Sequence, residues 1–133
     1  MNALQEKDAI REVLAKFCIC LDGGRFDEMA ALFTEDGTWE APFGKTTGRQ
    51  AISQAAATGR RDAAGRSSDI HLLSNIVIAL DGERANVHLN YVVVHNGPQG
   101  PQIRGGGVSA DEMVKQSGKW LFHYRKTDRL IPP

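Results

Sequence analysis

Two ionisable residues far apart in the sequence, Asp22 and His71, are of the types that abstract protons together. Asp22 ends a predicted helix, just before a Gly-Gly pair, where the negative end of the helix dipole disfavours a carboxylate. A carboxylate bound to an imidazole fixes its tautomer and stabilises the imidazolium that forms when the ring takes a proton. This chemistry would make Asp22 an orienting group and His71 a general base. The residues alone leave simpler readings open: a polar cap in the turn for Asp22 and a core histidine for His71.

The other histidines are sorted by the alternation of side chains along predicted strands. In the strand at 84–95, His95 shares the more apolar face, whereas His88 lies among asparagines and is expected to be solvated. A bulge between them would exchange these faces, because a slip of one residue reverses every side chain. In the last predicted strand, His123 alternates with Arg125 and Thr127. The opposite face carries Trp120, Phe122 and Tyr124, and the pattern does not decide which of the two faces is inward.

Other motifs indicate structure rather than chemistry. The glycines at 105–107 are not followed by Lys-Ser/Thr, so close packing or a bulge is favoured over a phosphate loop. Ser109 has no adjacent His-Asp grouping or nucleophile elbow. Cys18 and Cys20 are two apart on a predicted helix, so they point to different sides and are expected to be buried, reduced thiols. We expect no metal site.

The secondary structure around these residues is predicted from the periodicity of apolar side chains. The first half is expected to contain a helix at 3–21, a helix at 26–33, a strand at 38–41, a loop or short strand at 43–48, and a helix at 49–58. The second half is expected to contain strands at 70–80, 84–95, 102–115 and 119–129. Between the halves lies a predicted surface loop solvated by Arg60, Arg61 and Arg66. Helices followed by an antiparallel meander predict an α+β domain with its helices on one face of a curved sheet.

Length and charge restrict the function further. The 133 residues suffice for one domain with a real core. Acidic and basic residues are balanced at 16 each, so no overall field attracts nucleic acid or an anionic membrane. The N-terminal segment is charged where a secretory signal would be apolar, and no transmembrane-length apolar run occurs in the sequence. We expect a single cytoplasmic domain over residues 1–133, with no nucleic-acid or membrane partner.

Four stretches carry a resemblance to a known family: LDGGRFDEMAALFTEDGTW, GRQAI, HLLSN and GKW. Together they resemble the SnoaL-like branch of the nuclear transport factor 2-like superfamily, over nearly the whole chain and in the right order. The resemblance implies three N-terminal helices on a strongly curved mixed, mainly antiparallel β-sheet that forms a cone with an internal hydrophobic pocket.

Within that superfamily the chain is similar to scytalone dehydratase, hexachlorocyclohexane dehydrochlorinase and bile acid 7α-dehydratase. This similarity implies that Asp22 and His71 form a catalytic dyad that removes a proton next to a leaving group. With a gap of one residue, His95 aligns with a further pocket residue of these enzymes. The similarity implies that it is a second acid or hydrogen-bond donor. The implied function is a cofactor-independent lyase of the dehydratase type, acting on a small apolar cyclic or polyketide-like molecule.

The sequence also departs from those relatives. Phe17 stands where relatives commonly have a tyrosine, so Tyr91 and Tyr124 are the candidates for a phenolic acid. The route used by ketosteroid isomerases is disfavoured, because Ala41 replaces their base carboxylate. The residues expected to bind substrate along the pocket wall are Phe17, Trp39, Phe43, Tyr91 and Tyr124.

Two other functions remain open at this stage. The same fold serves as a non-catalytic small-ligand-binding or assembly domain, and as an isomerase or epoxide-opening enzyme. Domains of this family commonly pair through the outer face of the sheet, so a homodimer or homotrimer is expected. No metal or nucleotide cofactor is implied.

Overall fold

A computed structural model describes residues 1–59 and 61–132, so Arg60, one of the three loop arginines, lies outside the described residues. The first helix, α1 (Ala3–Asp22), begins with a reciprocal capping pair, in which the side chains of Asn2 and Gln5 each accept the other's backbone N–H. It ends at a turn where Gly24 has a φ of +75° and a Cβ would meet the Gly65 carbonyl oxygen at 2.1 Å. Only glycine fits there, so the Gly-Gly pair fixes the direction in which the chain leaves Asp22.

The second helix is shorter and the first strand longer than the sequence predicts. Helix α2 (Phe26–Ala30) ends before Phe33, and β1 (Phe33–Ala41) begins at that residue. Phe33 pairs with Phe122 across the sheet, and the register shifts before Thr38. A tertiary pairing therefore overrides the helical spacing of the predicted segment. The chain continues through β2 (Gly44–Thr47) and α3 (Arg49–Ala56).

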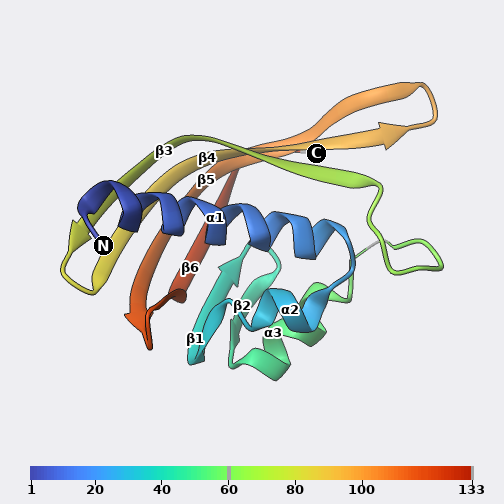
Figure 1. The fold of residues 1–133 in the computed structure, drawn as a ribbon. Coiled ribbons are helices and arrows are strands. Elements are labelled where there is room, and N and C mark those ends of the chain that lie inside the picture. The colour runs from blue at the N-terminus through green and yellow to red at the C-terminus, as the bar shows by residue number, and fades with distance from the viewer. Residues whose placement is uncertain (60, 133) are drawn as a thin grey trace.

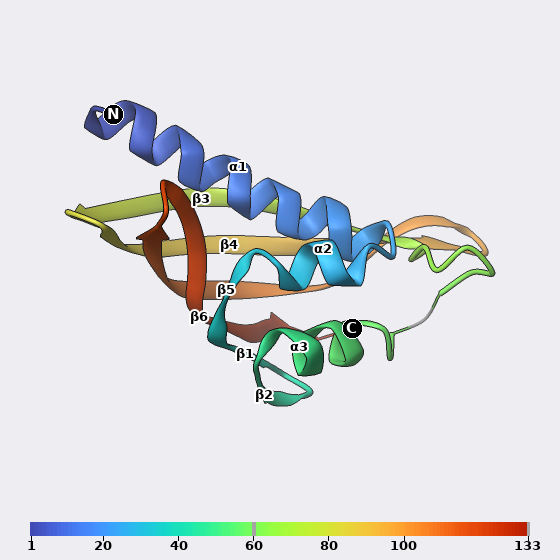
Figure 2. The same cartoon turned by 60° about the horizontal axis from the view of Figure 1, so that its bottom comes forward.

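Four long strands complete an open six-stranded sheet of order β2-β1-β6-β5-β4-β3. They are β3 (Asp69–Asp81), β4 (Arg84–Gly97), β5 (Gly100–Gln116) and β6 (Lys119–Ile131). All neighbours are antiparallel except β1 and β6. The sheet curls, and α1 crosses one face of it, while α2 and α3 lie beside β1 and β2 (Figures 1 and 2). The predicted α+β class and mixed, mainly antiparallel sheet are confirmed.

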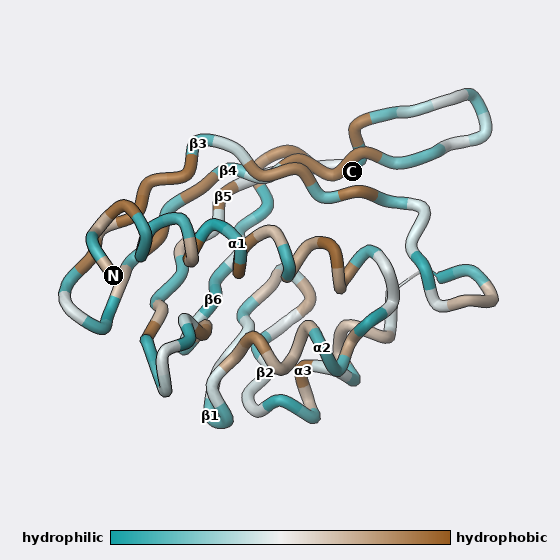
Figure 3. The backbone as a smooth tube through the Cα atoms, viewed as in Figure 1, coloured by the Kyte–Doolittle hydropathy of each residue, from teal (hydrophilic) through white to brown (hydrophobic). Residues whose placement is uncertain are grey.

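The core lies between α1 and the curled sheet. Hydrophilic and hydrophobic residues alternate along α1, and long hydrophobic stretches run along β3 and β4 (Figure 3). Phe17 of α1 contacts Phe33, Trp39 and Phe122 edge-on, with ring centroids 5.6 to 6.1 Å apart. This aromatic cluster joins the helix to β1 and β6. No helix in the described ranges is long and apolar enough to cross a membrane.

Candidate functional site

The structure brings Asp22 and His71 into contact at two points. The Asp22 carboxylate accepts a hydrogen bond from His71 Nδ1 at 2.7 Å on one oxygen, and from the His71 backbone N–H at 2.9 Å on the other. With Nδ1 as the donor, the other ring nitrogen, Nε2, carries a free lone pair. Both side chains are largely shielded, with 17 % of Asp22 and 27 % of His71 exposed. The pair thus has the geometry of an oriented imidazole base.

The end of α1 is held in place by contacts from residues that lie between α3 and β3. The Ser67 backbone N–H donates to the Asp22 carbonyl at 2.9 Å. Arg61 donates to the Leu21 carbonyl at 2.8 Å and to the Ala56 carbonyl at 3.2 Å. The cation offsets the negative end of the helix dipole, and the hydrogen bonds satisfy terminal carbonyls of α1. These contacts supply the compensation for Asp22 that the sequence does not reveal.

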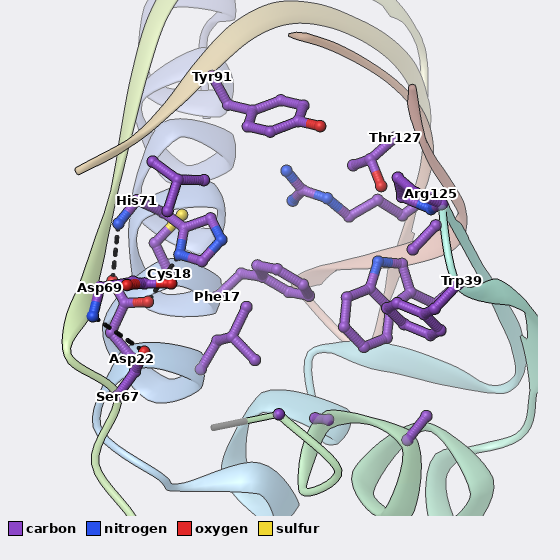
Figure 4. A pocket seen from close by; sticks show the side chains of 18 of the residues that line it. Phe17, Cys18, Asp22, Trp39, Ser67, Asp69, His71, Tyr91, Arg125 and Thr127 are labelled. Carbon is purple, nitrogen blue, oxygen red and sulfur yellow. Dashed lines mark hydrogen bonds and ion pairs between the residues drawn. The ribbon is translucent and has the colours of Figure 1, made fainter. Parts of the chain in front are cut away.

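His71 lines a pocket of about 450 Å³ between α1, the sheet and α3. Four of the five predicted substrate-binding residues line it: Phe17, Trp39, Phe43 and Tyr91. Figure 4 shows His71 and Asp22 on one side of this pocket and Trp39 and Arg125 on the other. The pocket therefore places the proposed base opposite aromatic and cationic groups.

Tyr124 differs from this expectation, because a bulge in β6 turns it away. Glu112 pairs with Tyr124 but Met113 pairs with Phe122, which leaves His123 as the extra residue. The bulge exchanges the faces of the strand. Tyr124 therefore lines a different hollow and donates a hydrogen bond to Glu40 at 2.5 Å. Phe122 before the bulge and Arg125 after it are both buried, which settles the face that the sequence left open.

His95 lies beside the pocket in a second carboxylate–imidazole pair. Its Nδ1 is 2.6 Å from the Asp69 carboxylate, and Asp69 is its cross-strand neighbour. Arg104 donates to the same carboxylate at 3.0 Å. Asp69 and Arg104 line the pocket themselves, and Asp69 is two residues before His71 on the same face of β3. His88 points to the opposite face and is exposed, as predicted.

Arg125 and Arg61 are pocket residues that the sequence reasoning missed. Arg125 is only 2 % exposed, and its guanidinium lies 4.3 Å from the ring centroid of Phe17. Its alternation with Thr127 was visible in the sequence, but the bulge that turns this pair inward was not. The prediction that Arg61 solvates a surface loop is wrong. Its guanidinium donates to the carbonyls at the end of α1 and α3 and stacks on Phe26 at 4.7 Å.

The glycines and cysteines behave as predicted. A Cβ on Gly107 would lie 1.9 Å from the Asp128 carbonyl oxygen, so close strand packing explains the glycine run. Cys18 and Cys20 are buried free thiols, and burial raises the pKa of Cys18 to about 11. Within residues 1–59 and 61–132, no group of three His, Cys, Asp or Glu side chains is arranged to hold a metal ion.

Comparison with solved structures gives relatives for this architecture. A variant of Rv3472, a protein of unknown function from Mycobacterium tuberculosis, is 28% identical with a TM-score of 0.85; the match covers 95% of this chain and 77% of that one. A "Putative Scytalone Dehydratase" from Novosphingobium aromaticivorans is also 28% identical, with a TM-score of 0.79 and coverage of 96% and 86%. An NTF2-like protein with a cystatin-like fold from the same species is 20% identical, with a TM-score of 0.84 and coverage of 96% and 83%, and shows the fold alone.

A search of the curated proteins finds no match. The family model described as the SnoaL-like domain matches residues 2–126, which is nearly the whole chain. The order of elements and the pairing of Asp22 with His71 agree with the resemblance seen in the sequence. This chain belongs to the SnoaL-like domain family.

Proposed function

We propose that the protein is a cofactor-independent lyase that eliminates water from a small apolar cyclic or polyketide-like molecule. The observation that carries the proposal is the double hydrogen bond between Asp22 and His71 at the wall of the pocket. The similarity to the Novosphingobium protein, whose name is that of a dehydratase, supports the same reaction class.

In the proposed reaction, His71 Nε2 removes a proton from the carbon next to the one that bears the hydroxyl group. The C–H electrons form the double bond as the C–O bond breaks, and the leaving hydroxide takes a proton to become water. Asp22 keeps the proton on Nδ1 and stabilises the imidazolium while it exists. His71 can return its new proton to the leaving group, so no second imidazole is required.

The pocket walls restrict the substrate. Phe17, Trp39 and Phe43 provide aromatic surface, and a pocket of about 450 Å³ is in the range that holds small molecules. Tyr91 is the phenol that lines the pocket, and burial raises its pKa. The hydroxyl is protonated at neutral pH and donates a long hydrogen bond, 3.4 Å, to the Asp128 carbonyl, which a substrate oxygen could replace as the acceptor.

A cyclic β-hydroxyketone tests the proposal directly. Loss of water from 3-hydroxy-3,4-dihydronaphthalen-1(2H)-one, followed by tautomerisation, gives 1-naphthol, whose formation is followed by ultraviolet absorption. We expect the protein to accelerate this reaction, and His71→Ala and Asp22→Asn to abolish most of the acceleration. His88→Ala is the matched control, because this histidine is exposed on the opposite face of the sheet.

Deuterium exchange at C2 of the same ketone separates the alternatives. Exchange without loss of water would indicate an isomerase-type proton transfer instead of elimination. Binding of the ketone with neither exchange nor elimination would favour the non-catalytic binding domain.

Assembly into a homodimer or homotrimer and a cytoplasmic location are also part of the proposal. Light scattering tests the oligomeric state.

A further inference from the structure

Arg125 is a buried cation, and some of its hydrogen-bond donors have no partner within the described part of the chain. Only 2 % of the residue is exposed, and both Nε and one Nη nitrogen lack a hydrogen-bond partner there. The guanidinium rests on Phe17 at 4.3 Å and on Phe122 at 4.8 Å. Buried donors normally have partners, and leaving a charged one unpaired is costly. A bound ligand would supply the missing acceptor.

The nearest carboxylate does not supply it. Asp111 Oδ1 is 3.6 Å from Arg125 Nε, which is too far for a hydrogen bond, and it already accepts one from Ser109 at 2.9 Å. Burial raises the pKa of Asp111, and the charge of Arg125 opposes this shift. Asp111 is thus a charge partner of Arg125, but it leaves Nε and one Nη of the guanidinium without a hydrogen-bond acceptor.

A second unused donor lies next to it. Trp39 is 5 % exposed, and its indole N–H has no partner among residues 1–59 and 61–132. Figure 4 shows the Arg125 guanidinium pointing into the pocket toward His71. The indole nitrogen of Trp39 lies at the edge of the ring that faces the Arg125 side chain. Both residues line the pocket. Two donors, one of them charged, thus lie side by side at the wall of the pocket opposite His71.

We propose that the substrate carries a carboxylate on its apolar ring, and that Arg125 and Trp39 bind this carboxylate across the pocket from His71. A planar guanidinium matches the two oxygens of a carboxylate, and a buried arginine is preferred for such pairs. The charge of the pocket agrees, because the lining residues include four arginines, at 61, 104, 125 and 129, against Asp22 and Asp69. This inference rests on the proposed function only in using the same pocket.

Calorimetric titration with 2-naphthoate and 2-naphthamide tests the inference, because the two have the same shape and differ in charge. We expect 2-naphthoate to bind at least tenfold more tightly, and to keep that advantage in 0.5 M NaCl, since a buried pair is little screened. Equal affinity for the two compounds would overturn the proposal. So would an advantage that disappears in high salt, because that result places the anion at the exposed rim.

Two variants identify the binding group. The double variant Arg125→Met/Asp111→Leu removes the charge without leaving a buried carboxylate unpaired, and its fold is checked by circular dichroism. It should lose the preference for 2-naphthoate, whereas Arg129→Met, at an exposed lining residue, should keep it. The reverse pattern would overturn the assignment. Trp39→Phe should weaken the binding of 2-naphthoate more than that of 2-naphthamide, because the hydrogen bond from the indole N–H to a charged carboxylate is stronger than that to an amide oxygen. An unchanged 2-naphthoate affinity would remove Trp39 from the site.

The test is independent of catalysis. 2-Naphthoate has no leaving group, so it binds or fails to bind whether or not His71 acts as a base. Elimination activity without preference for 2-naphthoate would contradict this inference alone. A clear preference for 2-naphthoate with no elimination of any tested hydroxyketone would contradict the proposed function and leave the carboxylate site standing.

Discussion

The two oxygens of Asp22 bind two different groups of His71, the ring Nδ1 at 2.7 Å and the backbone N–H at 2.9 Å. The carboxylate therefore fixes both the start of β3 and the orientation of the imidazole that this strand carries. One residue at a helix end and one at a strand start thus form a rigid unit. This relationship makes a sharp prediction about tautomers.

Asp22→Asn should leave the fold intact and reduce turnover strongly. An asparagine oxygen can still accept from the His71 backbone, but its NH₂ then faces Nδ1 and favours the tautomer with the proton on Nε2. That tautomer cannot accept a proton at the pocket, so we expect a loss of about 10³- to 10⁴-fold in kcat. Steady-state kinetics on the hydroxyketone measure the loss, and Asp22→Glu is a useful comparison. Turnover within tenfold of the unmodified protein would remove Asp22 from the mechanism.

His95→Gln should reduce kcat by less than about tenfold, because His95 is bound to Asp69 beside the pocket. Its main effect should be on stability, with a loss of about 1 to 2 kcal/mol, since a charge-assisted hydrogen bond is removed. Kinetics and urea denaturation of the same variant separate the two effects. A loss of 10² or more in kcat, with unchanged stability, would instead identify His95 as the second acid implied by the family resemblance.

Arg61→Met should destabilise the protein by about 1 to 3 kcal/mol. The change removes the hydrogen bonds to the carbonyls of Leu21 and Ala56 and the stacking on Phe26. Arg66→Met is the matched control from the same loop, because the Arg66 side chain is 67% exposed. That variant should stay within about 0.5 kcal/mol of the unmodified protein. Equal effects in urea denaturation would mean that the contacts of Arg61 are not specific.

Cys18 should make stability fall at high pH. Burial raises its pKa from 9.0 to about 11, so the folded state holds this proton more tightly than the unfolded state does. The associated stability is fully present below pH 9 and is lost as the pH rises toward 11. Between pH 8 and 10.5, the unmodified protein should lose about 2 kcal/mol more than Cys18→Ala does. Urea denaturation at both pH values checks this, and parallel losses would contradict it.

Gly107→Ala should destabilise the fold by about 3 kcal/mol, because the new Cβ would press on the Asp128 backbone at 1.9 Å. Strand β6 would have to move away from β5 at this point. Gly59→Ala is the control, since the nearest neighbour of its new Cβ, the Arg61 guanidinium, is at an ordinary van der Waals distance of 3.6 Å. Its free energy of unfolding should change by no more than about 0.5 kcal/mol. Thermal unfolding of the two variants gives the comparison.

Much of the fold is determined by short-range patterns in the sequence. The apolar spacing of α1 and the Gly-Gly turn are local signals, and α1 begins at the predicted residue and ends one residue later than predicted. The alternation along β4 likewise predicts that His88 faces outward. The pairing of Asp22 with His71 was expected from their chemistry and from the family resemblance, although 49 residues separate them.

The other pocket residues could not be predicted from the sequence, because their positions depend on pairings between distant segments. The bulge at His123 arises from the register of β6 against β5, and it moves Tyr124 out of the pocket and Arg125 into it. Periodicity within one strand cannot locate such a shift, since a slip of one residue exchanges the two faces. Arg61 reaches the end of α1 only because the fold returns its loop to that point. The proposed base can thus be predicted from residue types and order, whereas the groups that face it depend on how the sheet packs.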